Sequence, residues 1–320
     1  MKKLIILLLI ISLPIFSFAD NSYVKKGSIG TQKAQPEDYY ADIYSYRPIE
    51  TWIGNKFVFY PKRKRDLIYT DKYDDMIEIV NDPEFGRDYH PIYKNCVGRV
   101  GTVTKIDKKI TPSPPGHPAE IIYDVYLKMD DNGKTYKILA REGIVEGLVS
   151  VTDIENARKE WIGKTLWYLR KYIYSYDEEK DREKTISVGK YTPLKVMDVV
   201  ASWDPLRPIR FIVRTDRGEI GFVDLNFSGT NVPDGSWYNE NRFGTYFITE
   251  DPQNWPLLYK FLIRFHVVKK GMNTQQVLVA LGEPVEKIKT SFPHEEWIYP
   301  KDKHLIFEKD ILKQKITPRH

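Results

Sequence analysis

A weak internal duplication is present in the first two thirds of the chain. Residues 52–60, which begin Trp-Ile-Gly, resemble residues 161–169, and residues 102–107 resemble residues 194–199. The chain has 320 residues with 13% aromatic side chains, enough for two or three packed domains rich in strands. Two copies of strand, long loop and strand predict two small β-barrels in tandem.

Each copy closes with a predicted β-hairpin. The turns at residues 130–133 and 215–218 both end in glycine, which supplies the positive φ that tight hairpins need. The end of the second copy, with the motif Gly221-Phe222-Val223, resembles the closing strands of bacterial SH3-like domains, whereas the first copy has Tyr136-Lys137-Ile138 there. The resemblance implies a module that binds peptides or cell-wall material.

The chain changes character after residue 250, where two helices and then strands are predicted. Asn273 and Gln276 can form a capping box, Gly282 can end that helix, and Pro284 prevents its continuation. The expected buried face of this helix comprises Val277, Ala280 and Leu281. An earlier amphipathic helix is predicted from apolar residues at helical spacing, namely Leu257, Leu258, Phe261, Leu262 and Phe265. The strand-like segments that follow are residues 285–290, 296–299, 304–307 and 311–316.

This pattern resembles the BamE/SmpA type of small outer-membrane assembly lipoprotein, whose fold also occurs in β-lactamase-inhibitor-like repeats. The matching residues are Gly271, Met272, Val277, Leu281, Gly282, Pro284, Trp297, Tyr299, Leu305 and Phe307. The resemblance implies an α+β domain in the cell envelope. This chain has no Cys at the place of the family's lipid-bearing Cys, and the matching domain follows some 250 other residues instead of standing alone. The family's role in barrel assembly therefore does not carry over directly.

The first 19 residues have the pattern of a secretory signal. Lys2 and Lys3 precede an apolar run, and Ser17-Phe18-Ala19 provides small residues at positions −3 and −1, which predicts cleavage after Ala19 and a periplasmic protein. The alternative is an uncleaved anchor, although the run is short for a span and contains Pro14. Cleavage lowers the net charge from +5 to +3, which argues against a nucleic-acid partner, and no integral membrane span is expected afterwards.

These patterns divide the chain into modules and connecting segments. The expected fold is mostly β with a small α+β C-terminal domain, that is, two tandem SH3-like barrels followed by a two-helix plus antiparallel-sheet domain. The predicted boundaries are 1–19 signal peptide, 20–50 irregular leader, 51–150 first barrel, 151–160 connector helix, 161–232 second barrel, 233–250 linker and 251–320 C-terminal domain.

The inventory of catalytic residues is thin. Cys96 is the only cysteine, which excludes a disulfide within the chain, and His90 lies nearby in sequence as a candidate partner for a thiolate. We interpret Cys96 as a buried or edge-strand residue. The remaining histidines have no metal-ligand spacing, and no phosphate-binding or nucleophile-elbow motif occurs. We therefore expect no enzyme activity, cofactor or metal.

The sequence predicts an exported interaction or scaffold protein that binds an envelope protein or peptidoglycan. The candidate contacts are loop aromatics flanked by Gly, Pro and Asp, namely Trp203, Trp237 and Tyr238, with local packing under a loop as the alternative role. A second hypothesis is an inhibitor that blocks an exported enzyme through the C-terminal domain, by analogy of fold. A third, a cell-wall hydrolase, requires a polar cleft that these residues do not supply.

Overall fold

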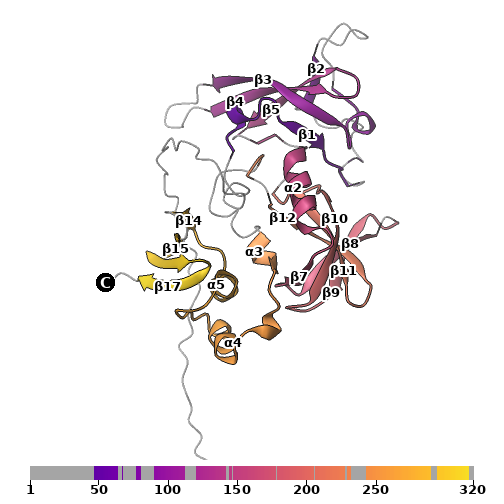
Figure 1. Cartoon of the computed structure of the whole chain (residues 1–320). Coiled ribbons are helices and arrows are strands. Elements are labelled where there is room, and N and C mark those ends of the chain that lie inside the picture. Colours follow the sequence, from indigo (N-terminus) through magenta and orange to yellow (C-terminus); the bar gives the residue numbers. More distant parts are fainter. Residues whose placement is uncertain are drawn as a thin grey trace, which may run out of the picture. The chain divides into compact units, whose positions relative to one another are not determined.

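The structure is a computed structural model, and its strands form three antiparallel sheets (Figure 1). It describes residues 47–63, 67, 77–80, 90–111, 120–141, 144–145, 147–177, 179–204, 206–227, 229–231, 243–289 and 294–316. The expectation of a mostly β chain is confirmed. The predicted signal, most of the leader, and part of the predicted linker lie outside the described residues.

The first sheet has six strands in the order β2-β5-β4-β3-β1-β6. Buried residues alternate with more exposed ones, most clearly along β5, because successive side chains point to opposite faces. The buried face of the sheet packs in a core that contains Trp52, Phe57 and Tyr136. Two short 3-10 helices, η1 (Ile49–Thr51) and η3 (Tyr93–Asn95), lie in the same part of the chain. The strands are β1 (Lys56–Phe59), β2 (Ile77–Val80), β3 (Val100–Thr111), β4 (Glu120–Met129), β5 (Thr135–Arg141) and β6 (Leu148–Ser150).

The second sheet has seven strands in the order β13-β7-β10-β11-β12-β8-β9. Its core contains Leu166, Val196 and Phe211, and Phe243 from the short helix α3 (Phe243–Tyr246) packs into it. The strand β13 falls in the segment predicted to be a linker, where it pairs with β7. The strands are β7 (Thr165–Tyr168), β8 (Tyr172–Asp177), β9 (Arg182–Ser187), β10 (Pro193–Ala201), β11 (Ile209–Thr215), β12 (Ile220–Leu225) and β13 (Phe247–Ile248).

The two sheets repeat one strand order. Five strands occur as β5-β4-β3-β1-β6 in the first sheet and as β12-β11-β10-β7-β13 in the second, and β2 and β8 occupy equivalent flanking places. The backbone bonds before the first strand also repeat: Gly54 donates to Val103 at 2.8 Å, and Gly163 donates to Val196 at 2.9 Å. The internal duplication seen in the sequence is therefore also a duplication of topology.

The hydrogen bonds correct one detail of that duplication. They align Val103 with Val196, whereas the sequence comparison set residues 102–107 against residues 194–199 and was displaced by one position. Each sheet has a β-bulge directly after the aligned valine. Successive side chains of a strand point to opposite faces, so an alignment displaced by one residue matches inward-facing residues of one copy with outward-facing residues of the other. A β-bulge adds one residue and reverses the alternation after it, so the error is not visible in the apolar pattern.

The prediction of barrels is corrected in one respect. No strand pairing in the described residues joins the two ends of either strand order, so both sheets are open. The edge strands β6, in the first sheet, and β13, in the second, are short. Each pairs with one inner neighbour, β1 and β7 respectively, and not with the strand at the opposite end of its sheet.

A helix and a buried asparagine connect the two sheets. The predicted connector is α2 (Val151–Trp161), which contacts β10 as well as β1 and β6. Its N-cap is Ser150, whose side chain accepts from Asp153 N at 3.3 Å. Asn231 Oδ1 accepts a hydrogen bond from Val145 N at 2.7 Å. Its Nδ2 donates to the carbonyl oxygens of Val145 and Leu148.

After β13 the chain forms a 3-10 helix, two α-helices and a four-stranded sheet. In Figure 1 this last sheet, β14-β15-β16-β17, lies beside α5. The capping box of Asn273 and Gln276 at the start of α5 is confirmed, and Val277 and Ala280 are buried as predicted, whereas Leu281 is only half-buried. The elements are η5 (Pro252–Asn254), α4 (Leu257–Arg264), α5 (Thr274–Leu281), β14 (Glu286–Lys289), β15 (His294–Tyr299), β16 (Lys303–Glu308) and β17 (Ile311–Ile316).

The helix α4 presents to solvent most of the apolar face predicted from its sequence. Leu257 is 82% exposed and Phe261 is 60% exposed, whereas Ile263 is only 6% exposed and packs with Trp255 in the core. Leu258 and Phe265 are also exposed, and Leu262 is half-buried. The helix therefore packs through a side that apolar spacing did not identify, because spacing defines a stripe but not what covers it.

Candidate binding site

Trp203 lies in the loop between β10 and β11, and its neighbours in that loop fix its position. Asp204 accepts two bonds from the Arg207 side chain, at 2.8 and 2.5 Å, and a third from Leu206 N at 2.9 Å. The Ser202 hydroxyl accepts from Asp204 N at 3.1 Å. Trp203 is half-buried, so it packs locally and still presents part of its ring to solvent.

The guanidinium of Arg210 lies between two aromatic rings. Its carbon is 3.6 Å from the ring centroids of both Trp203 and Phe222, a cation–π contact with each ring, and the two rings themselves meet edge to face with centroids 5.7 Å apart. Arg210 also donates two bonds of 2.7 Å to the carboxylate of Asp224. The two charged side chains are 8% and 7% exposed, so the pair is a buried, bidentate salt bridge beneath Trp203.

Burial raises the pKa of the Asp224 carboxyl, and the hydrogen bonds from Arg210 oppose this effect. Ser202 also hydrogen-bonds to this carboxylate, which ties the start of the Trp203 loop to β12. The charge of Arg210 is thus compensated inside the protein. The residues above it offer a ligand aromatic rings and not a free cation.

Two tyrosines of β8 extend this surface. Tyr176 packs on Trp203 with ring centroids 5.2 Å apart, and Tyr174 packs on Phe222 at 6.1 Å. We call Tyr174, Tyr176, Trp203 and Phe222 the aromatic cluster. It joins the β8–β9 hairpin to the β10–β11 loop, and three of its four members are half-buried.

A glycine allows β8 to approach β12 this closely. A Cβ atom at Gly221 would lie 2.7 Å from the Tyr174 carbonyl oxygen and 2.7 Å from Ile173 Cδ1. The first sheet has Tyr136 at the equivalent place, where its ring is buried against Phe59. The glycine of the Gly221-Phe222-Val223 motif therefore leaves room for β8 beside β12, a close approach that belongs to the second sheet.

The other predicted contacts have different outcomes. Trp237 and Tyr238 lie outside the described residues, so the structure does not bring them together with Trp203. The sequence analysis missed Arg210, Asp224 and the tyrosines of β8. The tyrosines had a usable signal, because alternate Tyr residues at 172, 174 and 176 occupy one face of a strand.

Cys96 is buried, which is one of the two positions expected from the sequence. Burial raises the pKa of its thiol to about 12, and its hydrogen-bond partner is Tyr136. His90 directs Nδ1 to the Ile77 carbonyl at 2.9 Å. Within the described ranges, no group of three or more His, Cys, Asp or Glu side chains could hold a metal ion.

Comparison with protein-family models, with curated proteins and with solved structures finds no match. Among the helices of the described residues, none has the length and apolar character needed to cross a bilayer.

Proposed function

We propose that this protein is an exported, non-enzymatic interaction protein of the bacterial envelope, and that the aromatic cluster binds a segment of a protein partner or of peptidoglycan. The observation that carries the proposal is the half-buried Trp203 on a loop fixed by Asp204, above a charge-compensated Arg210. Large rings held in place at low entropic cost are typical of binding hot spots.

The arrangement of the strands supports SH3-like modules in tandem. Both sheets share one strand order, and the hairpin β8–β9 flanks the second in the way β2 flanks the first. The aromatic cluster lies between that hairpin and the loop after β10. In this proposal the second module carries the binding surface, and the first, whose equivalent position holds buried Tyr136, supports it.

The chemistry of the cluster indicates the kind of ligand. Aromatic faces bind prolyl rings, aliphatic side chains and the apolar faces of sugars. Because Asp224 neutralises Arg210, we expect little dependence of binding on salt. An extended peptide or a glycan strand with attached peptides meets these conditions.

The envelope location rests on the two ends of the chain. The N-terminal segment has the pattern of a cleaved signal, and the order of α4, α5 and a four-stranded antiparallel sheet supports the BamE/SmpA-like resemblance. We propose a periplasmic protein on these grounds.

Sedimentation with purified peptidoglycan, together with cross-linking to extracted envelope proteins, tests the proposal. We expect the wild type to be retained by one of the two and Trp203→Ala and Tyr176→Ala to lose retention. Tyr172→Ala is the matched control, because Tyr172 lies on the same strand, is 49% exposed and is outside the cluster. Retention that survives both cluster variants, or that Tyr172→Ala also removes, would exclude the cluster as the binding surface.

A further inference from the structure

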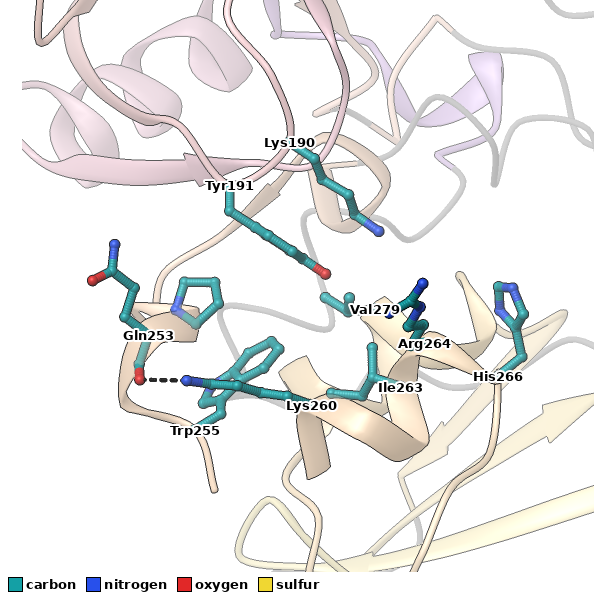
Figure 2. Close-up of a pocket in the computed structure, with 10 residues that line it drawn as sticks. Lys190, Tyr191, Gln253, Trp255, Lys260, Ile263, Arg264, His266 and Val279 are labelled. Atoms are coloured by element: carbon teal, nitrogen blue, oxygen red, sulfur yellow. Dashed lines mark hydrogen bonds between the residues drawn. The ribbon is translucent and has the colours of Figure 1, made fainter. Parts of the chain in front are cut away.

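An open pocket of about 680 Å³ lies between the β9–β10 loop and the helix α4 (Figure 2). Lys190 and Tyr191 reach toward it from the loop, and Lys260, Ile263 and Arg264 line it from α4. A pocket of this size is in the range of those that bind small molecules. It is separate from the aromatic cluster.

Cations surround the pocket. Lys190, Lys260 and Arg264 are the lining cations, and none of the described lining residues is acidic. Lys260 Nζ donates to the Gln253 carbonyl at 2.6 Å, which leaves its charge uncompensated. Within the described part of the chain, no carboxylate forms an ion pair with Lys190 or Arg264. The pocket therefore favours a negatively charged ligand.

The acids that precede η5 have other partners. Glu250 accepts from Trp255 Nε1 at 3.1 Å and from Asn273 Nδ2 at 2.7 Å. Asp251 accepts from Gln253 N at 2.8 Å and caps η5. Among the described residues, neither carboxylate forms an ion pair with Lys190, Lys260 or Arg264.

Apart from Tyr191, Gln253 and His266, the remaining lining is apolar. Trp255 and Ile263 are buried core residues that expose only an edge here, and Val279 adds an aliphatic wall from α5. On α4 the exposed side chains of Leu257 and Phe261 lie next to the cationic flank of the helix.

Two bulky side chains of the lining are held by unusual backbone. Tyr191 has φ of 69° and His266 has φ of 56°, in the left-handed region that such residues rarely adopt. Tyr191 N donates to the Tyr168 carbonyl at 2.6 Å, and His266 Nδ1 lies 2.8 Å from the Ala280 carbonyl oxygen. The first bond holds the backbone of Tyr191, and the second holds the imidazole of His266.

We propose that this pocket binds an amphiphilic anion, that is, a carboxylate or phosphate group carried on an apolar chain or ring. Lys190 and Arg264 receive the anionic group, Lys260 adds positive charge from the side of Gln253, and Trp255, Ile263 and Val279 receive the apolar body. The ligand source is either a free amphiphile or a membrane lipid, and both offer this chemistry.

Calorimetric titration of the purified protein with decanoate tests the proposal. We expect saturable binding by the wild type, and binding about tenfold or more weaker in Lys260→Gln/Arg264→Gln, which removes two charged hydrogen-bond donors. Gln is a good helix former, so α4 is retained. The matched control is Lys269→Gln/Lys270→Gln, which removes two exposed cations outside the pocket and should bind as the wild type does.

Further ligands separate charge from apolar contact. Decanol and inorganic phosphate each carry half of the proposed chemistry, and both should bind more weakly than decanoate. Val279→Phe, which fills the pocket from its apolar side, should also weaken decanoate binding. Absence of saturable decanoate binding, equal loss in both double variants, or phosphate binding as tight as decanoate would overturn the proposal.

Vesicles distinguish the two sources. Flotation with phosphatidylglycerol vesicles, compared with phosphatidylcholine vesicles, should show retention that depends on Lys260 and Arg264 if the ligand is a lipid. Decanoate binding without vesicle retention supports a free amphiphile. Vesicle retention without decanoate binding would assign the effect to adsorption on a charged surface and refute the pocket.

Discussion

The buried pair of Arg210 and Asp224 supports a quantitative prediction about stability. Replacing Asp224 with Leu removes two hydrogen bonds of 2.7 Å and leaves a guanidinium that is 8% exposed without its counter-charge. Removing one partner of a buried pair costs about 3–5 kcal/mol of unfolding free energy. The contacts with Trp203 and Phe222 remain and compensate only in part, because they do not replace the lost carboxylate.

The double variant Arg210→Met/Asp224→Leu removes both charges and should recover most of this loss. Apolar replacement of a buried pair is often neutral or stabilising, so we expect the double variant within about 1 kcal/mol of the wild type. The first sheet has Leu139 at the place equivalent to Asp224, so this topology already accommodates leucine there.

Urea unfolding followed by near-ultraviolet circular dichroism measures the three proteins, since Trp203 stacks directly on Arg210. For a folded unit of about 150–250 residues, the loss of unfolding free energy in Asp224→Leu corresponds to a decrease in Tm of about 6–20 °C. A loss below about 1 kcal/mol in Asp224→Leu, or a double variant as unstable as the single one, would show that the pair is not held as a buried ion pair.

Three further predictions concern single positions. Gly221→Ala should lower the free energy of unfolding in urea by about 1–3 kcal/mol, because the new Cβ would meet the Tyr174 backbone. The control Gly218→Ala, whose Cβ would meet no atom within 4 Å, should cost only about 1 kcal/mol because of its positive φ. A larger loss in Gly218→Ala than in Gly221→Ala would contradict the proposed clash. Asn231→Gly, which suits the left-handed φ of 57°, should still lose about 3 kcal/mol with three buried hydrogen bonds, and a neutral effect on thermal unfolding would show that they contribute nothing. Cys96, whose pKa is about 12 in the fold, should react with an aromatic disulfide reagent at pH 8 roughly a hundredfold more slowly in folded than in unfolded protein, and equal rates would show that the thiol is accessible.

The candidate site shows why part of it could not be predicted. Trp203 was identified from its loop composition, because Ser, Asp and Pro around an aromatic residue mark an exposed turn. Arg210 and Asp224 gave no signal of their own, since they lie 14 residues apart on two strands and meet only through the register of β11 with β12. Long-range pairing of this kind is absent from local sequence patterns.

The sequence by itself determined the local structure. Capping residues produced α5, alternation and glycine turns produced the hairpins, and the repeated Trp-Ile-Gly segment indicated a repeated topology. Each of these rests on interactions between residues near one another in the chain, which side-chain periodicity and backbone preference reveal.

Tertiary structure alone decided which surfaces are covered. It buried Ile263 and exposed Leu257 and Phe261 on α4, and it placed Tyr176 on Trp203. It also brought Lys190 opposite Arg264 across the pocket. The physical reason is that an apolar stripe or a charged side chain has the same local energetics whichever neighbour it meets, so only the packing of distant segments determines its partner.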